Sequence, residues 1–92
     1  MKLDNRLKRV VSCDEATLRV TLEFTDGFRG TVDLTQLFRG AARPLPLEIL
    51  RGRLFERCFI EGGALAWANG YELCPDALRA RIVEQQRRRP AA

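Results

Sequence analysis

The stretch LRVTLEFTDGFRGTVDL, residues 18–34, decides the first half of the fold. Apolar and polar side chains alternate on either side of Thr25–Gly27, which is the pattern of two half-buried strands joined as a hairpin. A slip of one residue in register inverts every side chain, so the loop length must keep both apolar sets on one face. A three-residue loop does this, with Gly27 as the left-handed residue of a type I turn and G1 bulge. The predicted register pairs Phe24 with Phe28, Leu22 with Gly30 and Val20 with Val32.

A second hairpin is predicted around Gly62-Gly63. A two-residue loop at this position pairs Ile60 with Leu65 and Cys58 with Trp67, and all four side chains then fall on one face. The agreement between turn chemistry and apolar pattern supports both strands.

Shorter sequence patterns predict the elements in the rest of the chain. An earlier strand is predicted over Leu7–Ser12, with Cys13–Glu15 as its turn. Asp33, followed by Gln36 three residues later, resembles a capping box that opens a helical turn to Phe38. Residues 40–46 are predicted to form a loop. After the loop, Pro46 suits the first position of a short helix that holds Ile49 and Leu50 and ends at Gly52.

The clearest helix is the last one, between Pro75 and Pro90. Proline suits its first turn, and the second proline cannot continue it. Leu78 and Ile82 fall on one face, while Glu84 and Arg88 form an exposed i,i+4 pair. Just before this helix, Asn69-Gly70 is a third turn signal that leads into a short stretch, Tyr71–Leu73.

These elements predict an α+β fold with a small antiparallel sheet of four or five strands built from two hairpins, short helical turns and a C-terminal helix. Ninety-two residues form a single domain, 1–92, with an ordered core over about 6–86 and a basic tail at 87–92.

The charge is concentrated at the C-terminus. The formal net charge is +4 and falls to +1 without Arg87, Arg88 and Arg89. A short run of arginines is either a solvated helix end or an arm that binds phosphate. If nucleic acid is the partner, these three residues and Arg79 are the predicted contacts.

The residues offer little for catalysis. The chain has no histidine, which removes the commonest general base and most zinc sites. Cys13, Cys58 and Cys74 stand apart at no metal or redox spacing, which favours buried structural thiols in a reducing compartment. Cys74 alone precedes a helix N-terminus, where thiols become reactive. We therefore expect no catalytic residue, no cofactor and no metal, and we expect a cytoplasmic protein, because neither a secretory signal nor a membrane-spanning run is present.

A recognition surface is predicted at Trp67, Asn69, Tyr71 and Glu72. Partner anchors are often Trp, Tyr and Arg. Each of the first two residues has a structural alternative: Trp67 as a core side chain, and Asn69 as part of a type I′ turn with Gly70.

An ordered set of segments carries a family resemblance: residues 18–27, then Val32-Asp33-Leu34, then Phe55, and finally residues 67–78, WANGYELCPDAL. The set resembles the bacterial domain-of-unknown-function family 2442, over about residues 7–78. Ala68 stands where that family usually has proline, and the arginine-rich end exceeds its usual length.

The resemblance implies an α+β domain without an established activity. Some members look like the N-terminal part of longer proteins with a DNA-binding helix-turn-helix, which this chain lacks. Others look like one half of small two-gene pairs. We therefore expect a non-catalytic protein-binding module, with the regulatory or antitoxin-like half of such a pair as its role. Its partner is then another small protein, or a second copy in a homodimer, and not a membrane. The alternative is a nucleic-acid-binding accessory protein that uses its arginine-rich surface and tail.

Overall fold

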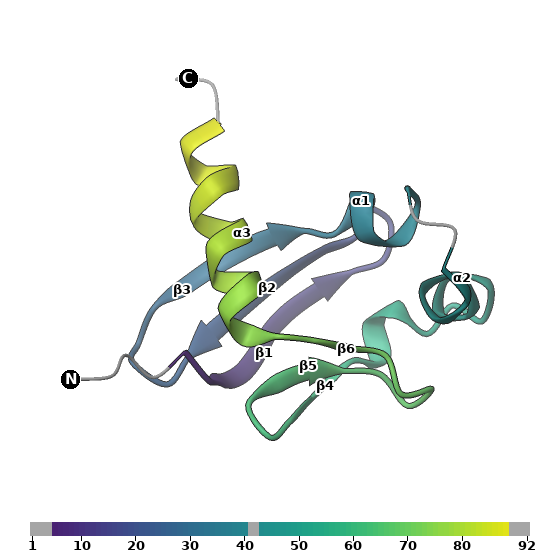
Figure 1. Ribbon diagram of the computed structural model, residues 1–92, viewed down its shortest axis with the longest axis horizontal. Helices are drawn as coiled ribbons and strands as arrows, with labels where there is room; N and C mark the ends of the chain where they lie inside the picture. The colour runs from purple at the N-terminus through teal and green to yellow at the C-terminus, as the bar shows by residue number, and fades with distance from the viewer. Residues whose placement is uncertain (1–4, 41–42, 89–92) are drawn as a thin grey trace.

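The computed structural model describes residues 5–40 and 43–88. The chain is α+β, as expected, and its described strands form two antiparallel sheets with the orders β1-β2-β3 and β4-β5-β6 (Figure 1). The elements in chain order are β1 (Leu7–Asp14), β2 (Arg19–Phe24), β3 (Arg29–Asp33), α1 (Thr35–Phe38), α2 (Pro44–Arg51), the 3-10 helix η1 (Phe55–Arg57), β4 (Phe59–Glu61), β5 (Ala64–Ala66), β6 (Glu72–Leu73) and α3 (Pro75–Arg88).

The first hairpin has the predicted register. Leu22 lies opposite Gly30 and Val20 opposite Val32, so the apolar sets of β2 and β3 share one face. The N–H of Phe24 donates to the carbonyl oxygen of Phe28 at 2.8 Å, which closes the three-residue loop. Gly27 has a φ of 93°, the left-handed conformation that the G1 bulge requires.

The second hairpin is also confirmed. Ile60 lies opposite Leu65, and the loop consists of Gly62 and Gly63, whose φ values are 58° and 84°. Two successive left-handed residues are the mark of a type I′ turn. β6 then adds a third strand, with Leu73 opposite Leu65.

The turn at Asn69-Gly70 is not the type I′ turn of the sequence prediction. A type I′ turn needs a positive φ at both central residues, and here only Gly70 has one, at 93°. The N–H of Gly70 donates to the carbonyl of Trp67 at 3.0 Å, and the N–H of Trp67 donates to the carbonyl of Tyr71 at 2.9 Å. The loop is therefore a three-residue type I turn with a bulge.

This loop repeats the geometry of the first hairpin. The side-chain oxygen of Asp26 accepts from the N–H of Phe28 at 3.0 Å, and that of Asn69 accepts from the N–H of Tyr71 at 3.1 Å. Both loops follow the pattern aromatic, any residue, Asp or Asn, Gly, aromatic. An Asp or Asn that bonds the backbone two residues ahead fixes such a turn locally.

The prediction of one sheet of four or five strands is wrong in its arrangement. The strands instead form two three-stranded sheets that adjoin at β1 and β4, and a hydrogen bond from the N–H of Leu7 to the carbonyl of Gly63 links the sheets at one end. Each hairpin has a single apolar face, and both faces are buried in the same core.

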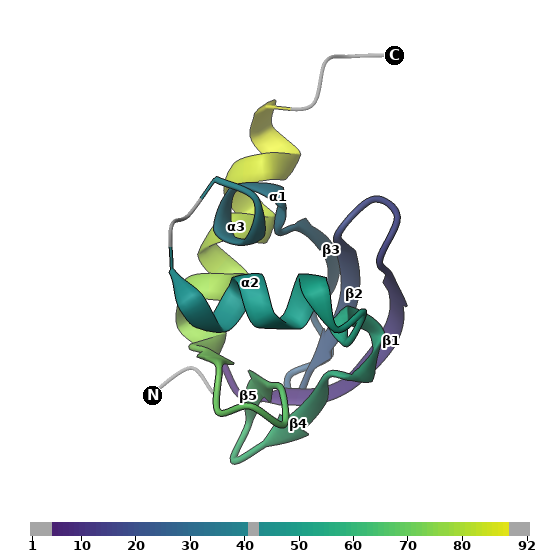
Figure 2. The ribbon, with the colours of Figure 1, turned by 90° about the vertical axis from the view of Figure 1, so that its right-hand side faces the viewer.

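The core is one continuous cluster that takes side chains from nearly every element. At its centre the ring of Phe38 contacts those of Phe55, Trp67 and Tyr71 edge-on, with centroids 5.1–5.7 Å apart. Figure 2 shows α2 crossing between the β1–β3 sheet and α3. Pro46 and Ile49 are the buried residues of α2, which closes this side of the core.

Several element ends differ from the prediction. β1 continues to Asp14, because its pairing with β2 runs to Arg19. β2 begins at Arg19, because Leu18 has a left-handed φ of 56° although its side chain is buried. α2 begins at Pro44 instead of Pro46, so that Pro44 takes the first helical position.

The two remaining helices also bear on the predictions. α1 has Leu34, not Asp33, as its N-cap, so the capping box does not form. α3 begins at Pro75 and buries Leu78 and Ile82, as predicted. The predicted stop at Pro90 lies outside the described residues. Within the described ranges, no helix combines the length and apolar character needed to cross a membrane.

Candidate functional site

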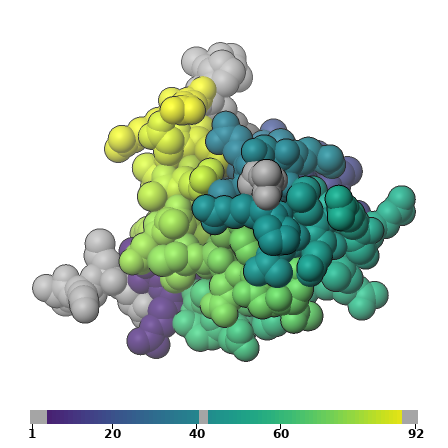
Figure 3. Space-filling model, turned by 45° about the vertical axis from the view of Figure 1, so that its right-hand side comes forward, coloured from purple at the N-terminus to yellow at the C-terminus, as the bar shows by residue number. Residues whose placement is uncertain are grey.

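A groove of about 800 Å³ lies where the outer face of β2 and β3 meets α1 and the end of α3. The space-filling view shows the last turns of α3 standing beside the segment around α1 (Figure 3). Most of the lining residues carry a hydroxyl, amide or guanidinium group. The lining consists of Arg19, Thr21, Arg29, Gly30, Thr31, Asp33, Thr35, Gln36, Gln85, Gln86 and Arg88.

The groove runs along the open edge of a sheet. β3 is an outer strand, and no other strand of the described residues pairs with its far side. The N–H of Leu34, just past the strand, donates to the carbonyl of Leu18, so even-numbered backbone groups point toward the hairpin partner. Backbone groups alternate in direction along a strand, so those of Arg29, Thr31 and Asp33 point toward the open edge.

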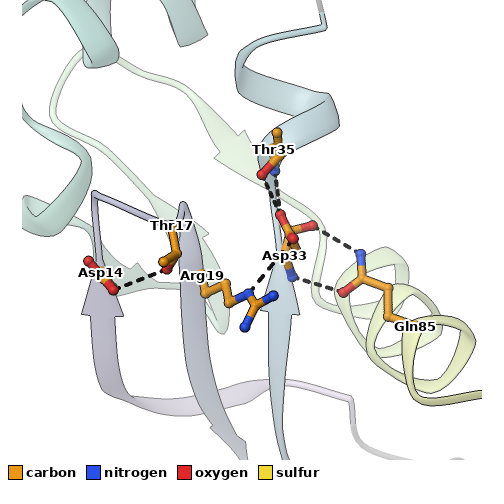
Figure 4. A network of polar contacts seen from close by, with 6 residues as sticks. All are labelled: Asp14, Thr17, Arg19, Asp33, Thr35 and Gln85. Atoms are coloured by element: carbon orange, nitrogen blue, oxygen red, sulfur yellow. Dashed lines mark hydrogen bonds and ion pairs between the residues drawn. The ribbon is translucent and has the colours of Figure 1, made fainter. Parts of the chain in front are cut away.

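The side-chain amide of Gln85 occupies the end of this edge. Its Oε1 accepts from the backbone N–H of Asp33 at 2.8 Å, and its Nε2 donates to the backbone carbonyl of Asp33 at 3.0 Å (Figure 4). An antiparallel partner strand makes the same two bonds to one residue. Gln85 therefore makes the bonds of a neighbouring strand at Asp33. No described strand pairs with the open edge of β3 at Thr31 or Arg29.

The carboxylate of Asp33 points away from that amide. Its Oδ1 accepts from the hydroxyl and the backbone N–H of Thr35, and its Oδ2 lies 3.8 Å from Nε of Arg19 (Figure 4). The Thr35 hydroxyl, followed by the Thr35 N–H and the Arg19 charge, holds the pKa of Asp33 below its usual value. Asp33 is consequently ionised at neutral pH, and its carboxylate stabilises the start of α1.

The groove carries more positive than negative charge. Its lining includes three arginines and one carboxylate. Arg29 pairs with Glu23 at 3.3 Å, and Arg88 pairs with Glu84 at 2.9 Å. Both arginine side chains are more than half exposed, at 53% and 77%. Exposed ion pairs of this kind contribute little, so these guanidinium groups are free to exchange partners.

The recognition residues predicted from the sequence lie elsewhere. Trp67 is a core residue with 2% exposure, and its indole N–H donates to the carbonyl of Phe55 at 3.0 Å. Asn69 is half-buried and donates to the carbonyl of Leu45 at 3.1 Å, which fastens its loop to α2. Tyr71 is half-buried beside the core, and Glu72 is exposed.

The arginines predicted to contact nucleic acid separate into two groups. The guanidinium of Arg79 pairs with Asp26 at 2.8 Å and lies over the ring of Phe28, 4.3 Å from its centroid. Arg87 and Arg88 are exposed on the last turn of α3. Arg89 lies outside the described residues.

The cysteines also differ from the prediction of three buried thiols. Cys74 is exposed, while Cys13 and Cys58 are half-buried. Cys13 and Cys58 are neighbours in the fold, with sulfur atoms 3.7 Å apart. The sequence did not predict this contact, because the two residues are 45 positions apart in the chain. Among the described residues, no group of three or more His, Cys, Asp or Glu side chains is arranged to hold a metal ion.

One signal for the groove was present in the sequence. Gln85 follows Leu78 and Ile82 at helical spacing, so it continues the buried face of α3 one turn further. An amide in that position predicts a polar contact at the rim of the core. The backbone of Asp33, 52 residues away in the chain, was not identifiable as its partner.

Comparison with known proteins gives one match. A family model described as "Protein of unknown function (DUF2442)" matches residues 9–84 of the 92 residues. No curated protein and no solved structure matches the chain.

Proposed function

The chain belongs to the DUF2442 family of proteins of unknown function, and from its geometry we propose that it is a protein-binding module that captures an extended, acidic segment of a partner along the open edge of β3. The segment adds a strand to the β1-β2-β3 sheet beside Thr31 and lies in the groove under the end of α3. This mode of recognition takes its affinity from backbone hydrogen bonds and its specificity from alternate side chains.

The pairing of Gln85 with Asp33 carries the proposal. The amide already makes the two bonds of a strand residue at one position of the edge, with lengths of 2.8 and 3.0 Å. The next outward-facing backbone groups, at Thr31 and Arg29, lie in line with it along β3. An unpaired strand edge is a template for a further strand. Because Gln85 occupies the backbone groups of Asp33, a bound segment would pair with β3 from Thr31 onward.

The charge of the groove selects the partner. Arg19, Arg29 and Arg88 line it against the single carboxylate of Asp33. Arg19 and Arg88 pair with exposed carboxylates and Arg29 with the half-buried Glu23, while the arginines themselves are more than half exposed. An incoming carboxylate therefore meets these guanidinium groups without a large desolvation penalty. Acidic side chains on one face of the segment therefore suit the groove, and basic side chains are repelled.

A pair of substitutions at Thr31 tests the edge. Thr31→Pro removes the outward N–H, and proline is tolerated on an edge strand because that N–H makes no bond to β2. Thr31→Val retains the N–H and loses the same hydroxyl, which lies 2.7 Å from that of Thr21. The probe is a short labelled peptide that alternates valine with glutamate, and its lysine counterpart is the control.

We expect the glutamate peptide to bind the wild-type chain and the Thr31→Val variant alike. Thr31→Pro should weaken binding about tenfold, the worth of one lost hydrogen bond and the clash of the ring. Equal binding to the proline and valine variants, or equal binding of the glutamate and lysine peptides, would rule the proposal out.

The partner itself is then identified by photo-crosslinking from position 31 in host lysate, with the exposed Thr25 as the control position. The role as the regulatory or antitoxin-like half of a bacterial gene pair predicts that the crosslinked protein is encoded next to this chain.

Nucleic acid is the second candidate, favoured by the three groove arginines and by Arg87 beside them on α3. Binding through these four arginines releases counterions and gives a slope of about −4 for log affinity against log salt. The discriminating variant is Arg87→Gln, which should reduce that slope by about one and leave the binding of the glutamate peptide unchanged.

A further inference from the structure

Cys13 of the first sheet and Cys58, directly before the second sheet, meet at the edge of the core. Cys13 is near the end of β1, and Cys58 follows η1 directly before β4. Their sulfur atoms are 3.7 Å apart although the residues are 45 positions apart in the chain. Cys74 is exposed and has no such neighbour among the described residues. The fold thus makes one thiol pair out of three scattered cysteines.

From this pair we infer a thiol–disulfide site: Cys13 and Cys58 form an intramolecular disulfide when a disulfide oxidant such as oxidised glutathione is present, and this bond locks β1 to the start of β4. The inference is independent of the proposed partner groove.

The geometry requires a small movement. A disulfide has an S–S length of about 2.0 Å, so the sulfur atoms must approach by roughly 1.7 Å. Cys58 lies at the junction between η1 and β4 and is not part of a strand. The pairing of β1 with β2 shifts register between Val10 and Ser12, directly before Cys13. Cys13 itself is paired with Val20, so the adjustment falls mainly on Cys58, which can move without breaking a regular ladder.

The surroundings distinguish the two thiols. The hydrogen-bond contact between the two sulfur atoms lowers the pKa of Cys58 and raises the pKa of Cys13, with burial and the nearby carboxylates of Glu56 and Asp14 adding to the increase at Cys13. The thiolate is the nucleophile in disulfide exchange. Cys58 is therefore the attacking thiol, and Cys13 resolves the intermediate.

The reaction balances in two exchanges. The Cys58 thiolate attacks one sulfur of oxidised glutathione, the S–S bond of glutathione breaks, and one glutathione leaves as a thiolate that takes up a proton. Cys13 then loses its proton to solvent and attacks the Cys58 sulfur of the mixed disulfide, which expels the second glutathione. Two protein thiols are oxidised to one disulfide, and one glutathione disulfide is reduced to two thiols.

The fold supplies an optical signal for this step. The carbonyl of Phe55 accepts from the indole N–H of Trp67 at 3.0 Å and lies 3.5 Å from the sulfur of Cys13. Trp67 is the only tryptophan in the chain. Movement of Cys13 toward Cys58 alters this shared contact, so oxidation should change the Trp67 fluorescence of the folded protein.

The experiment uses the reduced full-length chain, equilibrated with mixtures of oxidised and reduced glutathione without denaturant. Free thiols are then alkylated, and the products are mapped by mass spectrometry. We expect a peptide pair linked through Cys13 and Cys58, with Cys74 either free or carrying a single glutathione. The Cys74→Ser variant should form the same link. Cys13→Ser and Cys58→Ser should not, and Cys13→Ser should stop at the mixed disulfide on Cys58.

Two readouts accompany the mapping. The oxidised protein should melt at least about 5 °C above the reduced protein, because the link closes a long loop in the unfolded chain, and its Trp67 fluorescence should differ. Three outcomes would overturn the inference: three free thiols at every glutathione ratio, a link that involves Cys74, or a Cys13–Cys58 link that forms only in denaturant.

Discussion

The guanidinium of Arg79, on the first turns of α3, is paired at 2.8 Å with the carboxylate of Asp26 in the loop of the first hairpin. The same group lies over the rings of Phe28 and Phe24, 4.3 and 5.3 Å from their centroids. One side chain therefore fastens the C-terminal helix to a hairpin loop formed early in the chain, through both charge and ring contacts. This contact holds one side of α3, and Gln85 holds the other at Asp33.

Replacing Arg79 with methionine should destabilise the fold. Arg79→Met retains the apolar stem and removes the cation, so the loss of its contacts with Asp26 and the two rings should lower the free energy of unfolding by about 1 kcal/mol. Arg79→Lys is the matched variant, because it keeps the charge without the planar group that stacks on the ring. Urea unfolding should rank the stabilities as wild type, then lysine, then methionine. A methionine variant as stable as wild type would mean that these contacts contribute nothing.

Gly30 marks the closest approach between α3 and β3. A Cβ atom at this position would collide with Cγ2 of Ile82. Gly30→Ala should therefore lower the free energy of unfolding by about 1–3 kcal/mol, the usual range for overpacking. The control is the same change in an Ile82→Ala background, where the obstructing methyl group is gone. Equal losses in the two backgrounds, measured by denaturant unfolding, would contradict a direct contact.

Acid should destabilise the protein in a defined range. Contacts lower the folded-state pKa of three carboxyls: Asp26 through the Phe28 N–H and Arg79, Asp33 through Thr35, and Glu23 through Arg9 and Arg29. A lowered pKa contributes stability above the unfolded value of about 4 and loses it as the pH falls through the folded value. The urea midpoint should hold constant near pH 5 and fall below about pH 4.

Asp33→Asn is the variant that tests this assignment. It removes one of the three titrations and should make the acid decline shallower while lowering the plateau, because an amide accepts more weakly from Thr35. A decline of unchanged steepness would exclude Asp33 from the acid transition.

Tyr71 provides a direct titration, since it is the only tyrosine. Burial raises its pKa above the ordinary value, and Arg43 and Arg81 oppose the increase. The ultraviolet absorbance of tyrosinate should therefore appear at higher pH in the folded protein than in denaturant, where the midpoint is about 10. A raised pKa favours the neutral form, so this contribution to stability is present below the unfolded pKa and is lost as the pH rises. Arg81→Gln should move the folded midpoint higher still.

Most local features were predictable because they depend on neighbouring residues. The register of both hairpins follows from apolar alternation and loop glycines, and Leu78 and Ile82 mark the buried face of α3. The type I′ prediction for Asn69-Gly70 was wrong because the two residues fit two loop lengths. The hydrogen bond from Trp67 N–H to Tyr71 selects the longer one.

The candidate site was less predictable. Aromatic and amide residues near residue 69 suggested a recognition surface, but they face the core or α2. The groove instead consists of threonines, glutamines and arginines that carry no sequence signature, and it exists because α3 ends beside an outer strand. Side chains of ordinary type become a site only through their arrangement.

The sequence by itself determined most of the elements: which residues form the main strands, how the first two hairpins turn, and which face of α3 is apolar. Periodicity and turn chemistry act over a few residues, so they can be read directly along the chain. Only the tertiary structure decided that the strands divide into two sheets, that Cys13 meets Cys58, and that Gln85 closes the edge at Asp33. Cys13 and Cys58 are 45 residues apart in the chain, and Asp33 and Gln85 are 52 residues apart. These contacts arise because burying both apolar faces in one core fixes where every other side chain must lie.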